Sequence, residues 1–447
     1  MKDSTTAQTV ELLQTLIRNA CVNDGHADSG QEVRNADVLT STLEESGLAV
    51  ERFEAHPGRV SIVSRIEGRD AAAPSLCLMG HTDVVPANPD GWRHDPFGGE
   101  LIHGEVWGRG AVDMLNVTSS MAVAFTTLAK EGFQPSGDLI YFAVADEEAG
   151  STYGAQWMAD NHRDAMAADY VLTENGGLHG GSAKAPAITV NVGEKGVAWR
   201  RLRVTGTPGH GSMPFRTDNA LVKAAAVVQR LADYRPPARF SELWSGQVEF
   251  MNVDDELKAL LRDERRIDDL LASMPNVGSA GFLHACTHTT FSANVVDGGG
   301  SMKTNVIPDT VDLEVDIRTL PGDDGEAVTE HLRTALGDLW DKVDVEVIMN
   351  DPASISRTDN PLWTALERGV TVEFPSARLN PGMTVGFTDA RVYREMGSVA
   401  YGAGLFSPDL DPGDFSRRFH GHNERIDVES LRLTTNLWLN VARDLLG

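Results

Sequence analysis

The run LIYFAVADEE, residues 139–148, joins an apolar segment to a cluster of acidic side chains. Its first seven residues are uninterrupted apolar residues, which is typical of a strand covered on both faces in a parallel sheet. Two similar runs are SLCLMG at residues 75–80 and YVLT at residues 170–173, and a helical pattern at 117–130 separates SLCLMG from LIYFAVA. Because strands alternate with helices, the sequence predicts a mostly parallel α/β sheet.

The pattern changes near residue 193. The expected elements there are a strand at 196–205, a helix at 219–231, strands at 292–296 and 311–317, a helix at 325–336 and a strand at 343–348. This order predicts a small open-faced α+β sandwich with an antiparallel sheet. The segment 236–285 interrupts it as a mixture of helix and loop that the pattern does not assign further.

The first pattern returns after about residue 350 and ends in an expected helix at 428–446. The chain has 447 residues, which is too long for one ordinary hydrophobic core. We therefore expect a discontinuous first domain at 1–195 and 351–447, with a second domain at 196–350 inserted into it.

Charged side chains follow all three apolar runs directly. His81 and Asp83 follow the first run, Glu147 and Glu148 follow the second, and Glu174 follows the third. The carboxyl ends of parallel strands meet at one edge of a sheet, where ligands bind. A single acidic residue of this kind is usually a solvated loop residue, but three groups at matched positions predict a site.

Two further residues complete a set of metal-ligand types. Asp113 lies in WGRGAVDM, and His420 and His422 both lie in FHGHNERI. Imidazole nitrogens and carboxylate oxygens suit zinc, and two metals that share one carboxylate lie ~3.5–4 Å apart. Of the neighbours Glu147 and Glu148, one could bind metal while the other activates water as a general base. The alternative is an exposed acidic turn.

Composition narrows the class of protein. Lys and Arg number 39 and Asp and Glu 65, for a formal charge of −26, which disfavours binding to nucleic acid or an anionic membrane. The three cysteines are scattered and form no CxxC, so a thiolate zinc site is not expected. The N-terminus, MKDSTTAQTVELLQTL, does not resemble a secretory signal, and we expect a cytoplasmic protein.

Ten segments together resemble one family, the co-catalytic zinc metallopeptidases that include acetylornithine deacetylase, succinyl-diaminopimelate desuccinylase, glutamate carboxypeptidase, carnosinase and aminoacylase. The segments are GHTDVVP (80–86), WRHDPFGG with GEVWGRGAVDM (92–114), ADEEAGS (145–151), TEN (173–175), GEKG (193–196), GTPGHGSMP (206–214), NVIPDT (305–310), DIRTLPG (316–322), FTDAR (387–391) and FHGHNERI (419–426). The resemblance implies an α/β catalytic domain with a mixed, mostly parallel sheet and an inserted ferredoxin-like lid or dimerisation domain.

The resemblance also implies two Zn²⁺ ions per chain, with Co²⁺ or Mn²⁺ as substitutes. His81 and Glu174 would hold one ion, Glu148 and His420 the other, and Asp113 would bridge them. The family pattern favours His420 over the histidine two residues later. A cis peptide bond often follows the residue that matches Asp113.

The remaining roles concern the reaction and the substrate. The resemblance implies that Asp83 fixes the tautomer of the neighbouring zinc-binding imidazole. Glu147 would act as general base and then protonate the leaving amine. His210 would stabilise the oxyanion, in the same chain after domain closure or in the partner's site in a dimer. Asn305 and Arg318 would contact the substrate, and Arg318 suits a carboxylate.

These features predict a zinc-dependent hydrolase that cleaves the amide bond of a peptide or an N-acyl amino acid. The sequence leaves open whether it is a carboxypeptidase, a dipeptidase or an aminoacylase, and whether it is a monomer or a homodimer. Two alternatives are a metal-assisted hydrolase of another class, such as a phosphatase, and a binding protein of the same fold without activity. Few basic residues lie near the clusters, which disfavours a phosphatase.

Overall fold

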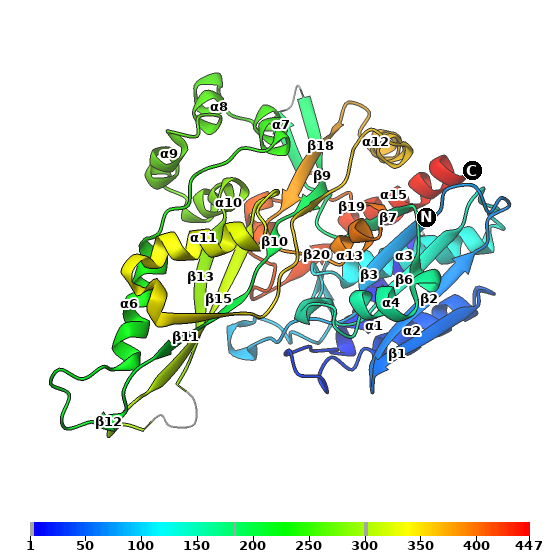
Figure 1. The fold of residues 1–447 in the computed structure, drawn as a ribbon. Helices are drawn as coiled ribbons and strands as arrows, with labels where there is room; N and C mark the ends of the chain where they lie inside the picture. The colour runs from blue at the N-terminus through cyan, green and yellow to red at the C-terminus, as the bar shows by residue number, and fades with distance from the viewer. Residues whose placement is uncertain (1–3, 183–184, 299–302) are drawn as a thin grey trace.

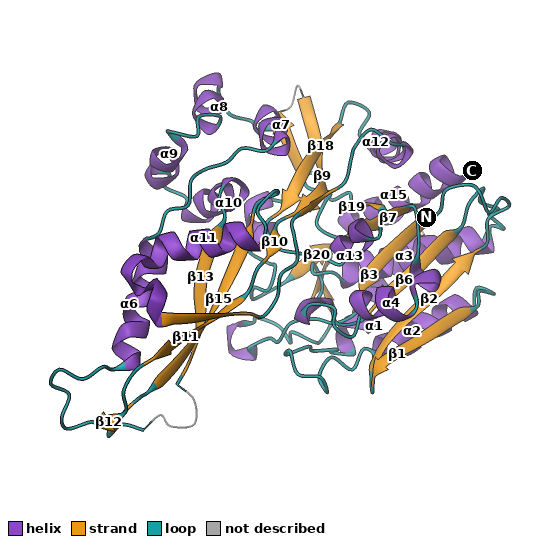
Figure 2. Ribbon diagram, in the orientation of Figure 1, coloured by secondary structure: helices purple, strands orange, loops and turns teal. Residues whose placement is uncertain are grey.

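The computed structural model describes residues 4–182, 185–298 and 303–447, and most of its strands belong to one large and one smaller sheet (Figures 1 and 2). Eight strands follow one another across the large sheet: β1 (Val50–His56), β2 (Arg59–Ile66), β6 (Leu139–Val144), β3 (Leu76–His81), β7 (Tyr170–Thr173), β19 (Val399–Gly402), β9 (Ala185–Glu194) and β17 (Ser354–Ile355). Two more strands, β8 (His179–Ser182) and β18 (Arg378–Thr384), also pair with β9.

The centre of the large sheet is parallel. Strands β6, β3, β7 and β19 pair in parallel, whereas β1 and β2 are antiparallel at one edge. Every residue of β6 is buried, and its side chains alternate between two hydrophobic clusters: Leu139 and Tyr141 pack in one, Ile140 and Phe142 in the other. Helices therefore cover both faces, and the prediction of a mixed, mostly parallel α/β sheet is confirmed.

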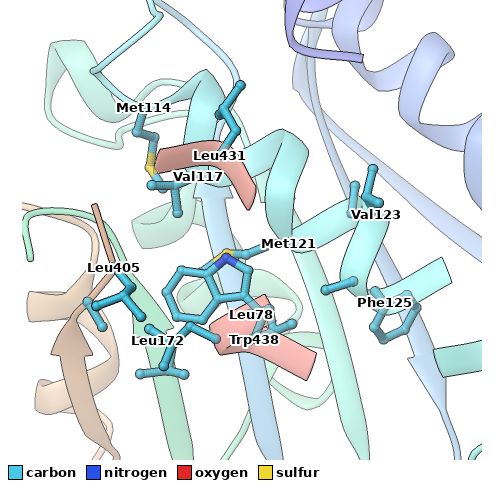
Figure 3. Packing of buried hydrophobic residues seen from close by; sticks show 14 of the residues in the cluster. Leu78, Met114, Val117, Met121, Val123, Phe125, Leu172, Leu405, Leu431 and Trp438 are labelled. Carbon is cyan, nitrogen blue, oxygen red and sulfur yellow. The ribbon is translucent and has the colours of Figure 1, made fainter. Parts of the chain in front are cut away.

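One face is covered by α1 (Ser4–Arg18), α2 (Val33–Glu44), α3 (Leu115–Lys130), α12 (Pro361–Glu373) and α15 (Val428–Leu446). The other is covered by α4 (Ala155–Asn161), α5 (Arg163–Met166) and α13 (Ala390–Glu395). Helix α3 is buried on nearly all sides because α1 and α15 pack against it from outside the sheet. Trp438 of α15 lies in this contact, where its indole nitrogen donates to the Ser120 hydroxyl at 2.9 Å (Figure 3).

The smaller sheet is antiparallel and contains β10 (Gly196–Val197), β11 (Arg200–Thr205), β13 (Thr290–Asp297), β15 (Thr310–Thr319) and β16 (Val343–Val347). Buried and half-buried residues alternate along β15, and α6 (Ala220–Asp233) and α11 (Gly325–Leu336) pack on the buried side. The open-faced α+β sandwich is therefore confirmed.

The segment 236–285, which the sequence left unassigned, contains four helices: α7 (Glu242–Phe250), α8 (Asp255–Leu261), α9 (Ile267–Ser273) and α10 (Val277–Thr287). They share a small core around Trp244, and α7 packs against β18 of the large sheet. Among the described residues, no helix is long and apolar enough to cross a membrane.

The strands support the expected domain division without defining it. The large sheet uses strands that end at Glu194 or begin at Ser354, and the smaller sheet uses strands between Gly196 and Val347. The boundaries at 195/196 and 350/351 stay a prediction. The chain thus passes between the two sheets twice, at residues 194–196 and 347–354.

Trp438 offers a test of the helix layer over the large sheet. Trp438→Ala would leave a cavity between α15 and α3 and remove the hydrogen bond that the Ser120 hydroxyl accepts, so we expect a loss of about 3–5 kcal/mol in stability. The measurement is the midpoint of chemical unfolding followed by circular dichroism. Trp438→Phe keeps an aromatic ring and should cost less. An alanine variant as stable as the parent would contradict this packing.

Candidate metal centre

The polar residues that follow the three central strands converge at one edge of the large sheet. His81 is the last residue of β3, Glu147 lies just beyond β6, and Glu174 directly follows β7. The His81 Nε2 atom lies 3.9 Å from the Glu147 Oε2 atom and 3.8 Å from the Glu174 Oε1 atom. The arrangement expected from parallel strand ends is therefore present in space.

Asp113 lies between two groups of potential metal ligands. Its Oδ1 atom is 3.2 Å from Nε2 of His81, and its Oδ2 atom is 3.1 Å from Nε2 of His420. Nε2 of His420 is also 3.2 Å from Oε2 of Glu148. One group contains His81, Asp113 and Glu174, and the other contains Asp113, Glu148 and His420. The Asp113–Met114 peptide bond is cis.

The charges at this edge favour bound cations. Burial raises the pKa values of Glu147 and Glu174 well above the usual range, and neighbouring carboxylates raise them further. Hydrogen bonds with Asp113 and Glu148 raise the pKa of His420 to about 10. The buried Oε1 atom of Glu148 has no hydrogen-bond partner among the described residues. Crowded carboxylates with an unpaired oxygen and two imidazoles fit the donor preference of zinc.

Asp83 supports the site, although not only through its carboxylate. The Nδ1 atom of His81 lies 3.0 Å from the backbone carbonyl oxygen of Asp83 and 3.5 Å from its Oδ1 atom. A proton on Nδ1 leaves Nε2 free to bind metal. The Asp83 carboxylate also accepts hydrogen bonds from the backbone N–H groups of Glu147 at 3.3 Å and Glu148 at 3.1 Å. Asp83 therefore orients both the His81 ring and the backbone of residues 147–148.

A buried polar network behind Asp83 was not predicted from the sequence. The Asn23 amide donates to Asp83 at 2.9 Å and to Asp146 at 3.0 Å. The Arg59 guanidinium pairs with Glu32 at 2.8 Å and with Asp146 at 2.5 Å. Loss of one member would leave a buried charge unpaired, so the network holds the start of the loop that carries Glu147.

A second buried pair connects the Asp113 loop to the C-terminal segment. The Glu424 carboxylate accepts from the backbone N–H groups of Val112 at 2.7 Å and Asp113 at 3.0 Å. The Arg109 guanidinium donates to Glu424 at 2.7 Å and to the carbonyl oxygen of His420 at 3.3 Å. These bonds place Asp113 beside His420, although the two residues are 307 positions apart in the sequence.

His420, rather than His422, lies with the metal-ligand candidates. The His422 ring packs against Gly91, where a Cβ atom would lie 2.2 Å from the ring Cε1 atom. His422 also lines a pocket of about 250 Å³ together with four arginines. The two histidines therefore face different surroundings.

His210 and Asn305 lie together, far from the metal-ligand candidates. His210 is in β12 (Gly209–His210), which pairs with β14 (Val306–Ile307) at the tip of the smaller sheet that points away from the large sheet (Figure 1). The backbone N–H of Gly211 donates to the Asn305 carbonyl at 2.8 Å. The structure does not bring either residue to the metal ligands of its own chain.

Arg318 lies at the junction of the two sheets. Its Nε atom donates to Asp316 at 2.7 Å, and its guanidinium lies over the rings of Phe387 at 5.2 Å and Trp199 at 5.9 Å. Its Nη1 atom is buried and lacks a hydrogen-bond partner in the described part of the chain. That N–H group is free to donate a hydrogen bond to a ligand.

Comparison with known proteins identifies the family of this chain. Residues 77–444 match the model of peptidase family M20/M25/M40. N-fatty-acyl-amino acid synthase/hydrolase PM20D1 of Xenopus tropicalis is 27% identical over 399 residues, covering 87% of this chain and 75% of that protein. Aminoacylase-1B of Rattus norvegicus is 28% identical over 392 residues, covering 86% and 83%.

Among solved structures, the metallo-carboxypeptidase Sso-CP2 from Sulfolobus solfataricus has a TM-score of 0.74 at 17% identity, with 99% of both chains covered. This likeness shows a shared fold. Since the family model spans most of the sequence, the chain belongs to peptidase family M20/M25/M40 and is a hydrolase of the amide bonds of peptides or N-acyl amino acids.

Proposed function

We propose that the chain is a two-zinc amidohydrolase in which Glu147 is the general base. The observation that carries this proposal is a pair of ligand groups that share Asp113, next to a buried carboxylate, Glu147, that belongs to neither group. His81 and Glu174 would hold one zinc, and Glu148 and His420 the other. When bound, the two ions would polarise the amide carbonyl and activate a water molecule.

The protein's own residues would then transfer the proton. Glu147 is placed to take a proton from the attacking water and to pass it to the departing amine. The carboxyl group would hold the proton between these two steps. Asp83 would keep both the His81 ring and the backbone of residues 147–148 in place during the exchange.

The substrate would carry a free carboxylate next to the scissile amide. The buried Nη1 atom of Arg318 supports this, because an N–H group without an acceptor is costly in a protein interior. The names of the relatives, an N-fatty-acyl-amino acid hydrolase and an aminoacylase, indicate N-acyl amino acids alongside peptides.

The three cysteines are buried and unpaired, which supports a reducing, cytoplasmic location.

We also infer a homodimer in which the tip of one chain reaches the metal centre of its partner. His210 and Asn305 both lie at this tip, remote from the ligands of their own chain (Figure 1). His210 of the partner subunit would donate to the oxyanion, and Asn305 of the partner subunit would contact the substrate.

The metal content can be tested first. We expect about two zinc ions per chain by elemental analysis, because the two ligand groups share one carboxylate. Chelation should abolish cleavage of N-acyl amino acids and dipeptides, and added zinc should restore it. His420→Ala should lose metal, whereas the matched control His422→Ala should retain it. The reverse result for these two variants would contradict the assignment.

If Glu147 is the general base, its replacement should lower the rate of catalysis without lowering metal binding. Glu147→Gln should retain both metals but lower kcat by about 10²–10⁴, the usual contribution of a general base. Glu148→Gln is the matched control, since it should lose metal as well as activity. Steady-state kinetics and metal analysis on both variants decide the matter. A fully active Glu147→Gln enzyme would disprove the proposed role.

The dimer can be tested by co-expressing two inactive chains, His210→Ala and Glu147→Gln. If His210 acts on the partner's site, a mixed dimer contains one site with Glu147 from the first chain and His210 from the second. Purified mixed dimers should therefore be much more active than either variant alone. If His210 acts within its own chain, every site lacks one group, and the mixed dimers stay inactive.

A further inference from the structure

We propose that Arg391 is a positioning residue that connects the loop of the general base to the place where the chain passes between the two sheets. Through this connection, the orientation of the smaller domain would set the position of Glu147. The inference rests on the proposed function for the role of Glu147, but its contacts are independent of any metal.

The loop at residues 146–151 needs support from outside. Asp146, Gly150 and Ser151 all have positive φ angles, of 64°, 94° and 67°. Such a loop has no regular ladder of backbone hydrogen bonds, although the Gly150 and Ser151 N–H groups donate to carbonyls within it. Asp83 holds the side of the loop that faces the metal ligands. The opposite side lies against the segment that begins helix α13.

Arg391 forms two hydrogen bonds with the loop on that opposite side. Its Nη2 atom donates to the carbonyl oxygen of Gly150 at 3.0 Å and to the hydroxyl oxygen of Ser151 at 3.2 Å. The Ser151 hydroxyl in turn donates to the Asp389 carboxylate. The Nη1 atom of Arg391 donates to the Thr388 carbonyl at 3.0 Å. The guanidinium is therefore fixed against the loop three residues after Glu147.

The third edge of the same guanidinium faces the smaller domain. The Nε atom of Arg391 donates to Oδ2 of Asp351 at 2.9 Å. Asp351 lies in the second passage between the sheets, and its backbone pairs with Val197 through two hydrogen bonds of 2.8 Å each. Val197 belongs to β10 of the smaller sheet. A movement of that sheet would therefore move Asp351, which is bonded directly to Arg391.

Helix α13 is also tied to the first passage between the sheets. Arg394, three residues after Arg391, forms an ion pair with the buried carboxylate of Glu194, the last residue of β9. Glu194 also accepts from the Thr388 hydroxyl at 3.2 Å and from the Ser354 hydroxyl at 3.3 Å. Arg394 also donates to the Ser354 hydroxyl at 3.3 Å, so it contacts both passages. Of the two arginines of this short helix, only Arg391 also hydrogen-bonds to the loop.

Phe387 gives the smaller domain a second contact with Arg391. The guanidinium groups of Arg391 and Arg318 both lie over its ring, at 4.8 and 5.2 Å. Arg318 comes from β15 of the smaller sheet and is the proposed partner of a substrate carboxylate. Because a guanidinium is planar with a fixed set of donors, a shift at one edge of Arg391 moves or breaks its bonds at the others.

Asp351→Ala tests the connection without touching the loop, the metal ligands or Arg391 itself. Asp351 is 40% exposed, so the variant should fold. A misplaced base lowers kcat, and a shift of about 1 Å can cost 10²-fold, so we expect a fall of at least about tenfold. KM, metal content and the thermal midpoint should stay close to those of the parent. Asp359→Ala, which removes an exposed partner of Arg357, is the matched control and should change none of these quantities.

A second readout does not depend on activity. Hydrogen–deuterium exchange of the peptide that contains residues 146–151 should be faster in Asp351→Ala and in Arg391→Met than in the parent or Asp359→Ala. If both residues act through one connection, the double variant should have the same kcat as Arg391→Met alone. A purely structural role predicts instead that exchange rises throughout the chain and that the thermal midpoint falls.

The proposal is overturned if Asp351→Ala keeps kcat within about twofold of the parent and leaves exchange at 146–151 unchanged. A loss of activity that only follows a loss of bound metal would overturn it as well. If the parent cleaves no amide substrate, the proposed function fails by itself, and the exchange measurement still decides whether Arg391 holds the loop through Asp351.

Discussion

The crowding of Asp113 with three other carboxylates is the constraint on which the rest of this structure depends. Asp113, Glu147, Glu148 and Glu174 share a small volume with two imidazoles, and burial disfavours their charged forms. Such a cluster repels itself unless cations neutralise it and unless the backbone fixes each side chain. Strands β3, β6 and β7 provide the first level of fixation, because their ends are held at the spacing of a parallel sheet.

Two buried arginines provide the second level of fixation, and they pair with carboxylates near opposite ends of the chain. Arg59 connects Glu32 to the loop after β6, and Arg109 connects the Asp113 loop to Glu424. Glu32 and Arg59 both precede residue 77, where the match to the family model begins. The metal centre therefore relies on supporting residues outside the segment that identifies the family. Because these charges are buried, each is stable only while its partner is present.

The sequence predicted the parts of this site that follow a local pattern. Apolar runs located the central strands, and the polar residues after them located the candidate ligands, because the end of a strand is a local feature. Residues such as Asn23 and Arg59 have no such signal, since their partners are 60 and 87 positions away. Strand β18 was also missed: it contains Pro381, and a proline inside a run argues against a strand. Apolar and polar residues alternate over 188–192 in β9, which is a usable local signal for a strand.

The position of His210 shows what a motif can and cannot tell. The GTPGHGSMP segment assigned a role to this histidine, but a role carries no information about which chain's site the residue serves. The tip that carries it exposes two large apolar side chains, with Met213 68% and Phe215 83% accessible. Exposed apolar groups beside a polar functional residue are typical of an interaction surface. A second copy of the chain, with its metal centre facing this tip, would cover the apolar groups and receive the histidine in a single contact.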